Sequence, residues 1–158
     1  MTSALSAPNR GPWPPLIYLG AIAIGIALTV IAPLPWIEGP LHDILFAAGW
    51  LLVAAGLALD ITAIRALMRA KTTVRPDGTA EHLVTSGPFS FTRNPIYLGN
   101  TTLMIGIGLI AGSIWFLVLG LLAAFATQVI TIVHEERYLK ARFGKKYHDY
   151  AGRVRRWI

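Results

Sequence analysis

Two long segments without a single charged residue constrain what this chain can fold into. The first covers Leu16–Ala32 and the second covers Ile96–Val133. A helix of a water-soluble domain needs one apolar face, whereas a segment that is apolar on every side requires an apolar solvent. Apolar residues make up 54% of the 158 residues and charged residues only 14%, against roughly 45–50% and about 25% in soluble domains. The sequence therefore predicts an all-α membrane protein with a single domain.

Prolines and short polar breaks divide the apolar sequence into four predicted transmembrane helices. We predict these helices over residues 16–32, 44–67, 96–110 and 114–133. The first helix covers roughly 25 Å at about 1.5 Å per residue, which is close to the ~30 Å hydrocarbon core of a bilayer. Only Ala111-Gly112-Ser113 separates the last two spans, so they form a tight hairpin. Asn94 and Pro95 are residue types that favour the N-cap and the first position of a helix, and they predict where the third span begins.

The polar segments of the chain follow the second span and the fourth span. Residues 75–95 are predicted to form a loop that starts with the turn-forming sequence Arg-Pro-Asp-Gly. Residues 134–158 are predicted to form an amphipathic helix and a tail whose basic residues, Arg153–Arg156, face lipid headgroups. Lys and Arg are abundant in both segments and absent from Pro33–Asp43. Because short basic loops remain in the cytoplasm, we expect both termini on the cytoplasmic side of a bacterial inner membrane.

The composition also excludes several classes of function. The chain has no cysteine, so disulfides, thiolate catalysis and cysteine metal sites are ruled out. The four histidines are scattered, and none has the close spacing to carboxylates that zinc and iron sites need, so we predict no metal site. The net charge of +6 arises beside the ends of apolar runs, with no nucleic-acid-binding motif. The expected partners are a membrane and a lipophilic small molecule or lipid, and no nucleic acid.

Two polar clusters are the candidates for chemistry, and the hairpin brings them to one edge of the membrane. The first cluster, Glu81–Gly99, leads into the third span, and the second begins at His134, where the fourth span ends. Backbone N–H groups exposed near the start of a helix favour an acceptor or an anion. We expect residues of both clusters to line one pocket, namely Arg93, Tyr97, Glu135 and Glu136.

The two clusters resemble the motifs of the isoprenylcysteine carboxyl methyltransferase family and of related membrane phospholipid methyltransferases. The first cluster matches a His-x-Leu-Val-Thr-x-Gly-Pro-Tyr block and an Arg-His-Pro-x-Tyr-x-Gly block with His82, Leu83, Val84, Thr85, Gly87, Pro88, Arg93, Pro95, Tyr97 and Gly99. The second matches Glu-Glu-x-x-Leu and Phe-Gly-x-x-Tyr-x-x-Tyr with Glu135, Glu136, Leu139, Phe143, Gly144, Tyr147 and Tyr150. The chain departs from the family at Asn94, where the family usually has His, and at Phe89, where it usually has Tyr.

The resemblance implies a methyltransferase that uses S-adenosylmethionine, held between the loop 75–95 and the C-terminal helix. It implies a lipophilic acceptor, similar to an isoprenylcysteine carboxylate or a phospholipid amine, that arrives from the bilayer. The implied cofactor-binding residues are His82, Leu83, Val84, Gly87, Pro88, Tyr97, Glu135 and Glu136. The implied catalytic residues are Arg93, Glu135 and Arg137. A glutamate would bind the ammonium or the ribose of the donor, and an arginine would anchor an acidic acceptor through a bidentate contact.

Two other functions fit the same predicted layout. A membrane reductase of the steroid-reductase type has a similar arrangement of spans and uses NADPH. A four-span transporter or assembly protein needs no reaction at all, although small multidrug exporters depend on an acidic residue within a span and the first span here has none. Structural roles also stay open for Glu136, which can pair with Lys140 one helical turn later, and for Asp60, near the end of the second span.

Overall fold

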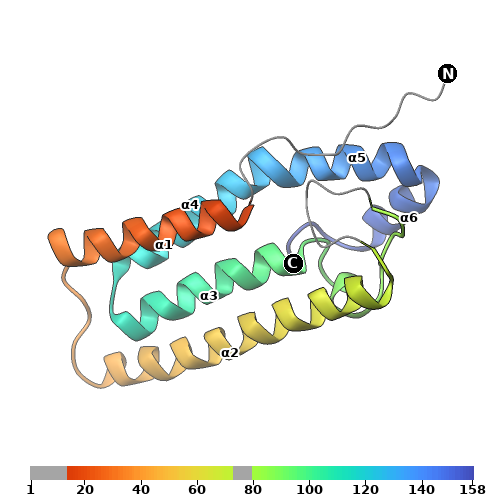
Figure 1. Ribbon diagram of the computed structural model, residues 1–158. Helices are drawn as coiled ribbons and strands as arrows, with labels where there is room; N and C mark the ends of the chain where they lie inside the picture. The colour runs from red at the N-terminus through yellow and green to blue at the C-terminus, as the bar shows by residue number, and fades with distance from the viewer. Residues whose placement is uncertain (1–13, 73–79) are drawn as a thin grey trace.

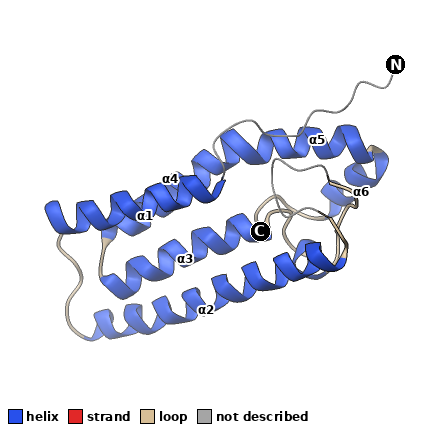
Figure 2. Cartoon of the chain, in the orientation of Figure 1, coloured by secondary structure: helices blue, strands red, loops and turns tan. Residues whose placement is uncertain are grey.

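The computed structural model describes residues 14–72 and 80–158 of the chain. Within these residues all regular secondary structure is helical, which confirms the all-α prediction (Figure 2). The apolar helices are α1 (Pro14–Ile31), α2 (Pro40–Arg69), α3 (Pro95–Ala111) and α4 (Ile114–Thr127). Helix α2 packs along α3, α3 packs on α4, and α4 packs on α1, so the four form an elongated bundle (Figure 1).

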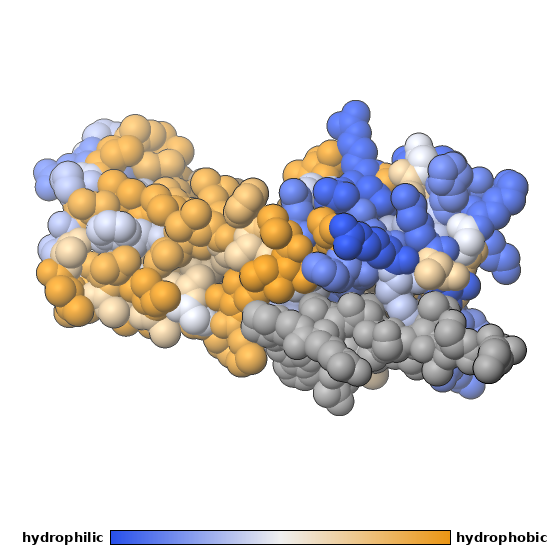
Figure 3. All heavy atoms as spheres, turned by 90° about the horizontal axis from the view of Figure 1, so that it is seen from above, coloured by the Kyte–Doolittle hydropathy of each residue, from blue (hydrophilic) through white to orange (hydrophobic). Residues whose placement is uncertain are grey.

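The lengths of the helices support three membrane spans directly. Within the described ranges, the stretches long and apolar enough to cross a membrane are residues 14–31, 40–69 and 114–143. Helix α3 is apolar but has only 17 residues, so it covers about 25 Å. The fourth predicted span therefore stays a prediction. Figure 3 shows mainly apolar surface over the bundle and most of the hydrophilic surface at one end of the molecule.

Glycines allow α2 and α3 to approach until their backbones touch. A Cβ atom added at Gly49 would lie 2.8 Å from the carbonyl oxygen of Gly106. One added at Gly56 would lie 2.9 Å from the carbonyl oxygen of Gly99. Side chains at these positions would force the helices apart. Small residues at contact points are typical of helices that associate in lipid. Lipid is itself apolar, so burying apolar side chains between the helices gives little free energy there.

Helix α4 continues without interruption beyond the bundle. It passes through a π-helical turn, Gln128–Ile132, into α5 (Val133–Phe143). Gly144 then adopts a φ of +51°, and α6 (Lys145–Arg153) folds back. The prediction of one amphipathic helix in this region is therefore wrong, because a residue without Cβ adopts the positive φ that ends α5. The π-helical turn was not predicted, and such turns are frequent at functional sites.

The loop that precedes α3 crosses the end of the bundle beside α5 and α6. Residues 75–79 of the predicted loop, with their Arg-Pro-Asp-Gly turn, lie outside the described residues. A short 3-10 helix, η1 (Gly87–Ser90), interrupts the rest of the loop. Helix α3 begins at Pro95, as predicted, with Asn94 at the N-cap position. The predicted N-cap position is confirmed, although the Asn94 side chain makes no capping hydrogen bond. Its amide donates instead to the Arg156 carbonyl oxygen, 2.9 Å away.

Candidate functional site

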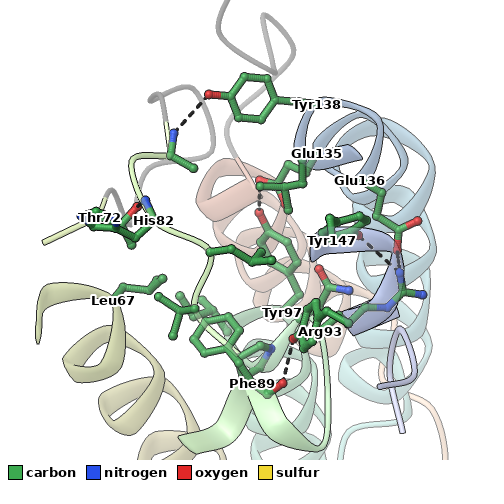
Figure 4. Close-up of a pocket in the computed structure, with 18 of the residues that line it drawn as sticks. Leu67, Thr72, His82, Phe89, Arg93, Tyr97, Glu135, Glu136, Tyr138 and Tyr147 are labelled. Carbon is green, nitrogen blue, oxygen red and sulfur yellow. Dashed lines mark hydrogen bonds and ion pairs between the residues drawn. The ribbon is translucent and has the colours of Figure 1, made fainter. Parts of the chain in front are cut away.

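A pocket of about 350 Å³ lies where the loop 80–94, the start of α3 and the helices α5 and α6 meet (Figure 4). We call this part of the molecule the polar end. Most of the predicted site residues line the pocket: His82, Leu83, Val84, Arg93, Tyr97, Glu135 and Glu136. The expectation that the two polar clusters share one pocket is therefore confirmed. The volume is within the range of roughly 300–1,000 Å³ that is common for small-molecule sites.

Tyr97 and Glu135 form one hydrogen-bonded pair in this pocket. The Tyr97 hydroxyl donates to Oε1 of Glu135 at 2.8 Å. Tyr97 is the third residue of α3, and Glu135 lies just beyond the π-helical turn. Helix α1 supports the pair from behind, because the Tyr18 hydroxyl donates to the Tyr97 carbonyl oxygen at 3.2 Å. A carboxylate oriented by a single hydroxyl keeps acceptor capacity for a cation or for ligand hydroxyls.

Glu136, the next residue, lies between two arginines. Arg156 makes a bidentate contact with it, at 2.9 Å and 2.8 Å. Arg93 approaches the same carboxylate at 3.2 Å, and the side chains of Arg93 and Glu136 are only 15% and 17% exposed. We call these three residues the arginine clasp. The alternative of a surface ion pair between Glu136 and Lys140 is wrong, because the carboxylate is already occupied by the clasp.

The clasp carries more positive than negative charge. Two guanidinium groups face one carboxylate, so the three side chains together keep one net positive charge. The Nε–H group of Arg93 is buried and has no hydrogen-bond partner among the described residues. Arg93 also donates to the Tyr147 hydroxyl at 3.3 Å. A ligand with a carboxylate or a phosphate can use both the charge and the unused donor.

The C-terminal tail holds the clasp in place. The carbonyl oxygen of Arg156 accepts hydrogen bonds from the side chains of Asn94 and, at 3.3 Å, Thr92. The backbone N–H of Arg93 donates to the Arg155 carbonyl oxygen at 3.0 Å. The expectation that the basic tail faces lipid headgroups is therefore wrong for Arg156, whose side chain and carbonyl oxygen both turn toward the site.

Two tyrosines of α6 line the pocket, although sequence reasoning did not list them as site residues. Tyr147 and Tyr150 are buried, and burial raises the pKa of both hydroxyls, so they stay protonated at neutral pH. The Tyr150 hydroxyl donates to the Phe89 carbonyl oxygen at 2.7 Å and holds the loop against α6. The sequence did contain a signal for them, because residues three apart lie on one face of a helix and both can therefore face the same pocket.

Three predicted site residues, Arg137, Gly87 and Pro88, do not line the pocket. Arg137 is exposed on α5. Gly87 and Pro88 line a separate groove beside α2. His82 is exposed at the rim of the pocket, and its backbone N–H donates to the Thr72 hydroxyl at 3.4 Å. Asp60 does not line the pocket either.

The apolar bundle and the pocket at its polar end define an integral membrane protein with a ligand-sized site. The sequence model of the phospholipid methyltransferase family matches residues 44–146, which is more than half of the chain. The chain therefore belongs to this family, in agreement with the resemblance of its motifs.

The chain is also similar to part of a metal-resistance protein. The nickel-cobalt-cadmium resistance protein NccN of Alcaligenes xylosoxydans xylosoxydans is 35% identical over 72 residues, which cover 46% of this chain and 33% of NccN. The chain thus matches about a third of the length of that relative. No solved structure matches the chain.

Proposed function

We propose that the chain is an integral membrane methyltransferase that uses S-adenosylmethionine and methylates a lipophilic or amphiphilic acceptor. The observation that carries this proposal is the presence of a carboxyl group and a net positive charge in one pocket. The Tyr97–Glu135 pair offers the carboxyl group, and the arginine clasp offers the net positive charge. The methyl donor carries both an ammonium group and a carboxylate, so it matches the pocket at two points.

In this proposal the two glutamates have different roles. Glu135 is the one that binds the ammonium or the ribose hydroxyls of the donor, because its partner is a neutral hydroxyl. Glu136 is a positioning residue, because two arginines already neutralise it. Arg93 then binds the donor carboxylate or an acidic group of the acceptor. Leu83 and Val84 add apolar contact area for the adenine ring.

The donor supplies an activated methyl group, and the protein supplies alignment. In a direct displacement, the bond from the acceptor atom to the methyl carbon forms while the methyl–sulfur bond breaks and its electron pair stays on sulfur. The residues of the pocket contribute by fixing both reactants and excluding water. Arg93, Glu135 and the tyrosine hydroxyls of α3 and α6 are placed for this task.

The proposed topology has four spans with both termini in the cytoplasm of a bacterium. Pro15 lines the pocket together with residues of α5 and α6, so the start of α1 and the C-terminal region lie at the same end of the bundle. Since the chain has no cysteine, single cysteines report its orientation. In intact cells, Glu38→Cys is expected to react with a membrane-impermeant maleimide and Lys146→Cys is not. The opposite pattern would invert the topology.

Equilibrium binding in detergent tests the proposed function against the reductase alternative. The purified protein is expected to bind S-adenosylmethionine and its demethylated product, and not NADPH. Binding of NADPH alone would overturn the proposal. Methyl transfer from labelled donor into a total lipid extract, followed by identification of the labelled product, then names the acceptor. The absence of both donor binding and labelled product would favour a non-enzymatic protein.

A further inference from the structure

A second hollow lies outside the pocket, between α2 and the loop that precedes α3. It is an open groove with a volume of about 1070 Å³. The helix contributes one continuous face to it, consisting of Ala55, Ala58, Leu59, Thr62, Arg65, Ala66, Arg69 and Ala70. The loop forms the opposite wall with residues 83–88 and Phe91. Four of the helix residues are alanines, whose short side chains leave room beside the helix.

The groove is apolar along most of its length and basic at one end. Arg65 and Arg69 are exposed and lie one turn apart, near the end of α2. Neither makes an ion pair with an acidic side chain of residues 14–72 or 80–158. Their end of the helix is the polar end of the molecule, where the headgroups of a bilayer would lie. The charge and the apolar face together match an amphiphile with an anionic head.

The groove and the pocket share a wall. Leu83 and Val84 line both of them. A molecule held in the groove therefore lies beside the pocket that we propose for the methyl donor. Gly87, which also lines the groove, has a φ of +62° and lets the loop turn close to α2.

We propose that this groove binds one membrane amphiphile with an anionic head group and presents it to the pocket as the methyl acceptor. The hydrocarbon chain lies along the alanine face of α2. The phosphate or carboxylate of the head group contacts Arg65 and Arg69, since guanidinium groups bind both anions in bidentate geometry. The assignment of this molecule as the acceptor rests on the proposed function. The binding of the anionic amphiphile does not.

Native mass spectrometry of the full chain, delipidated in detergent, tests the binding. The probes are dioleoyl phosphatidylglycerol, oleic acid and the zwitterionic dioleoyl phosphatidylcholine. The wild type is expected to retain one anionic molecule and no phosphatidylcholine. Retention of phosphatidylglycerol alone identifies a phosphate as the head group, and retention of oleic acid alone identifies a carboxylate. Equal retention of all three probes would overturn the proposal.

Variants of the groove make the test specific. The double variant Arg65→Ala/Arg69→Ala is expected to lower the affinity for the anionic probe at least about tenfold. Its matched control, Arg142→Ala/Arg153→Ala, removes two exposed arginines of α5 and α6 and is expected to bind like the wild type. Equal losses in both double variants would overturn the proposal.

A further variant separates failure of the groove from failure of the proposed function. Ala58→Trp fills the groove at a position that does not line the pocket. This variant is expected to lose binding of the anionic probe and to keep its affinity for S-adenosylmethionine. The retained affinity also shows that the variant is folded. Retention of the probe by Ala58→Trp would overturn the proposal that the groove is the binding site. Absence of donor binding in the wild type would overturn the proposed function and leave the lipid result standing.

Discussion

The apolar bundle and the polar end of this protein are held together by different interactions. In the bundle, α2 and α3 meet through their backbones at glycines such as Gly49 and Gly106. At the polar end, segments distant in sequence meet through side chains, as in the bidentate contact of Arg156 with Glu136. Apolar helices in lipid gain little from burying more apolar surface, so close backbone contact takes over. At the polar end, hydrogen bonds and ion pairs hold the segments together. They also leave polar groups available for a ligand.

The comparison shows how the site depends on both regions. Tyr97 lies at the start of α3, and its hydroxyl is the partner of Glu135 on α5. The position of α3 is set by its glycine contacts with α2, one of which, at Gly99, lies two residues after Tyr97. A change in the bundle is therefore expected to reach the pocket.

Replacing Gly106 by leucine is expected to have the largest effect. A Cβ atom there would already lie 2.8 Å from the Gly49 carbonyl oxygen, so the helices must separate. We expect a loss of about 3 kcal/mol in stability, together with weaker donor binding. The loss in stability is measured by unfolding in sodium dodecyl sulfate, monitored by circular dichroism. The control is Gly20→Leu, because a Cβ atom at Gly20 meets no atom within 4 Å. Equal losses would show that the glycine contacts do not hold the bundle.

The variant Glu136→Ala tests the arginine clasp and is expected to have the next largest effect. It leaves the largely buried Arg93 without its carboxylate, while Arg156, whose side chain is 36% exposed, regains water. We expect a loss of about 2 kcal/mol in the same unfolding experiment. Lys140→Ala, which removes an exposed charge one turn further along α5, is the control. A stability equal to that of the control would mean that the clasp contributes nothing to folding.

The variant Glu135→Gln separates binding from stability. It keeps the size of the side chain and its acceptor for the Tyr97 hydroxyl, but it removes the negative charge. We expect the affinity for S-adenosylmethionine to fall about tenfold, which is about 1.4 kcal/mol, with little change in unfolding. Tyr97→Phe is expected to lower the affinity less, because the carboxylate remains. Unchanged affinity in Glu135→Gln would remove this residue from the donor site.

The smallest effect is expected for Arg137→Ala. Arg137 was a candidate catalytic residue because an arginine could anchor an acidic acceptor, but it is exposed and does not line the pocket. We expect methyl transfer within about twofold of the wild type, the usual range for a surface substitution. A loss comparable to that of Arg93→Ala would return Arg137 to the site.

Much of the helical organisation was predictable, because it depends on local composition. The uncharged segments, the turn at Gly112 and the start of α3 at Pro95 all follow from the sequence and agree with the structure. The juxtaposition of the two polar clusters followed from the short hairpin. The π-helical turn and the break at Gly144 were missed, since each depends on how the segment beyond α4 packs against the loop and the tail.

The two adjacent glutamates show where prediction from the sequence ends. By itself the sequence determined that a pair of carboxylates lies at the end of a long apolar helix, because helix length and the position of charge are local properties. Only the tertiary structure decided that they differ. The partner of Glu136 is 20 residues away and that of Glu135 is 38 residues away, on different elements. Such contacts depend on how the chain folds back, and they make one carboxylate a structural anchor and leave the other for a ligand.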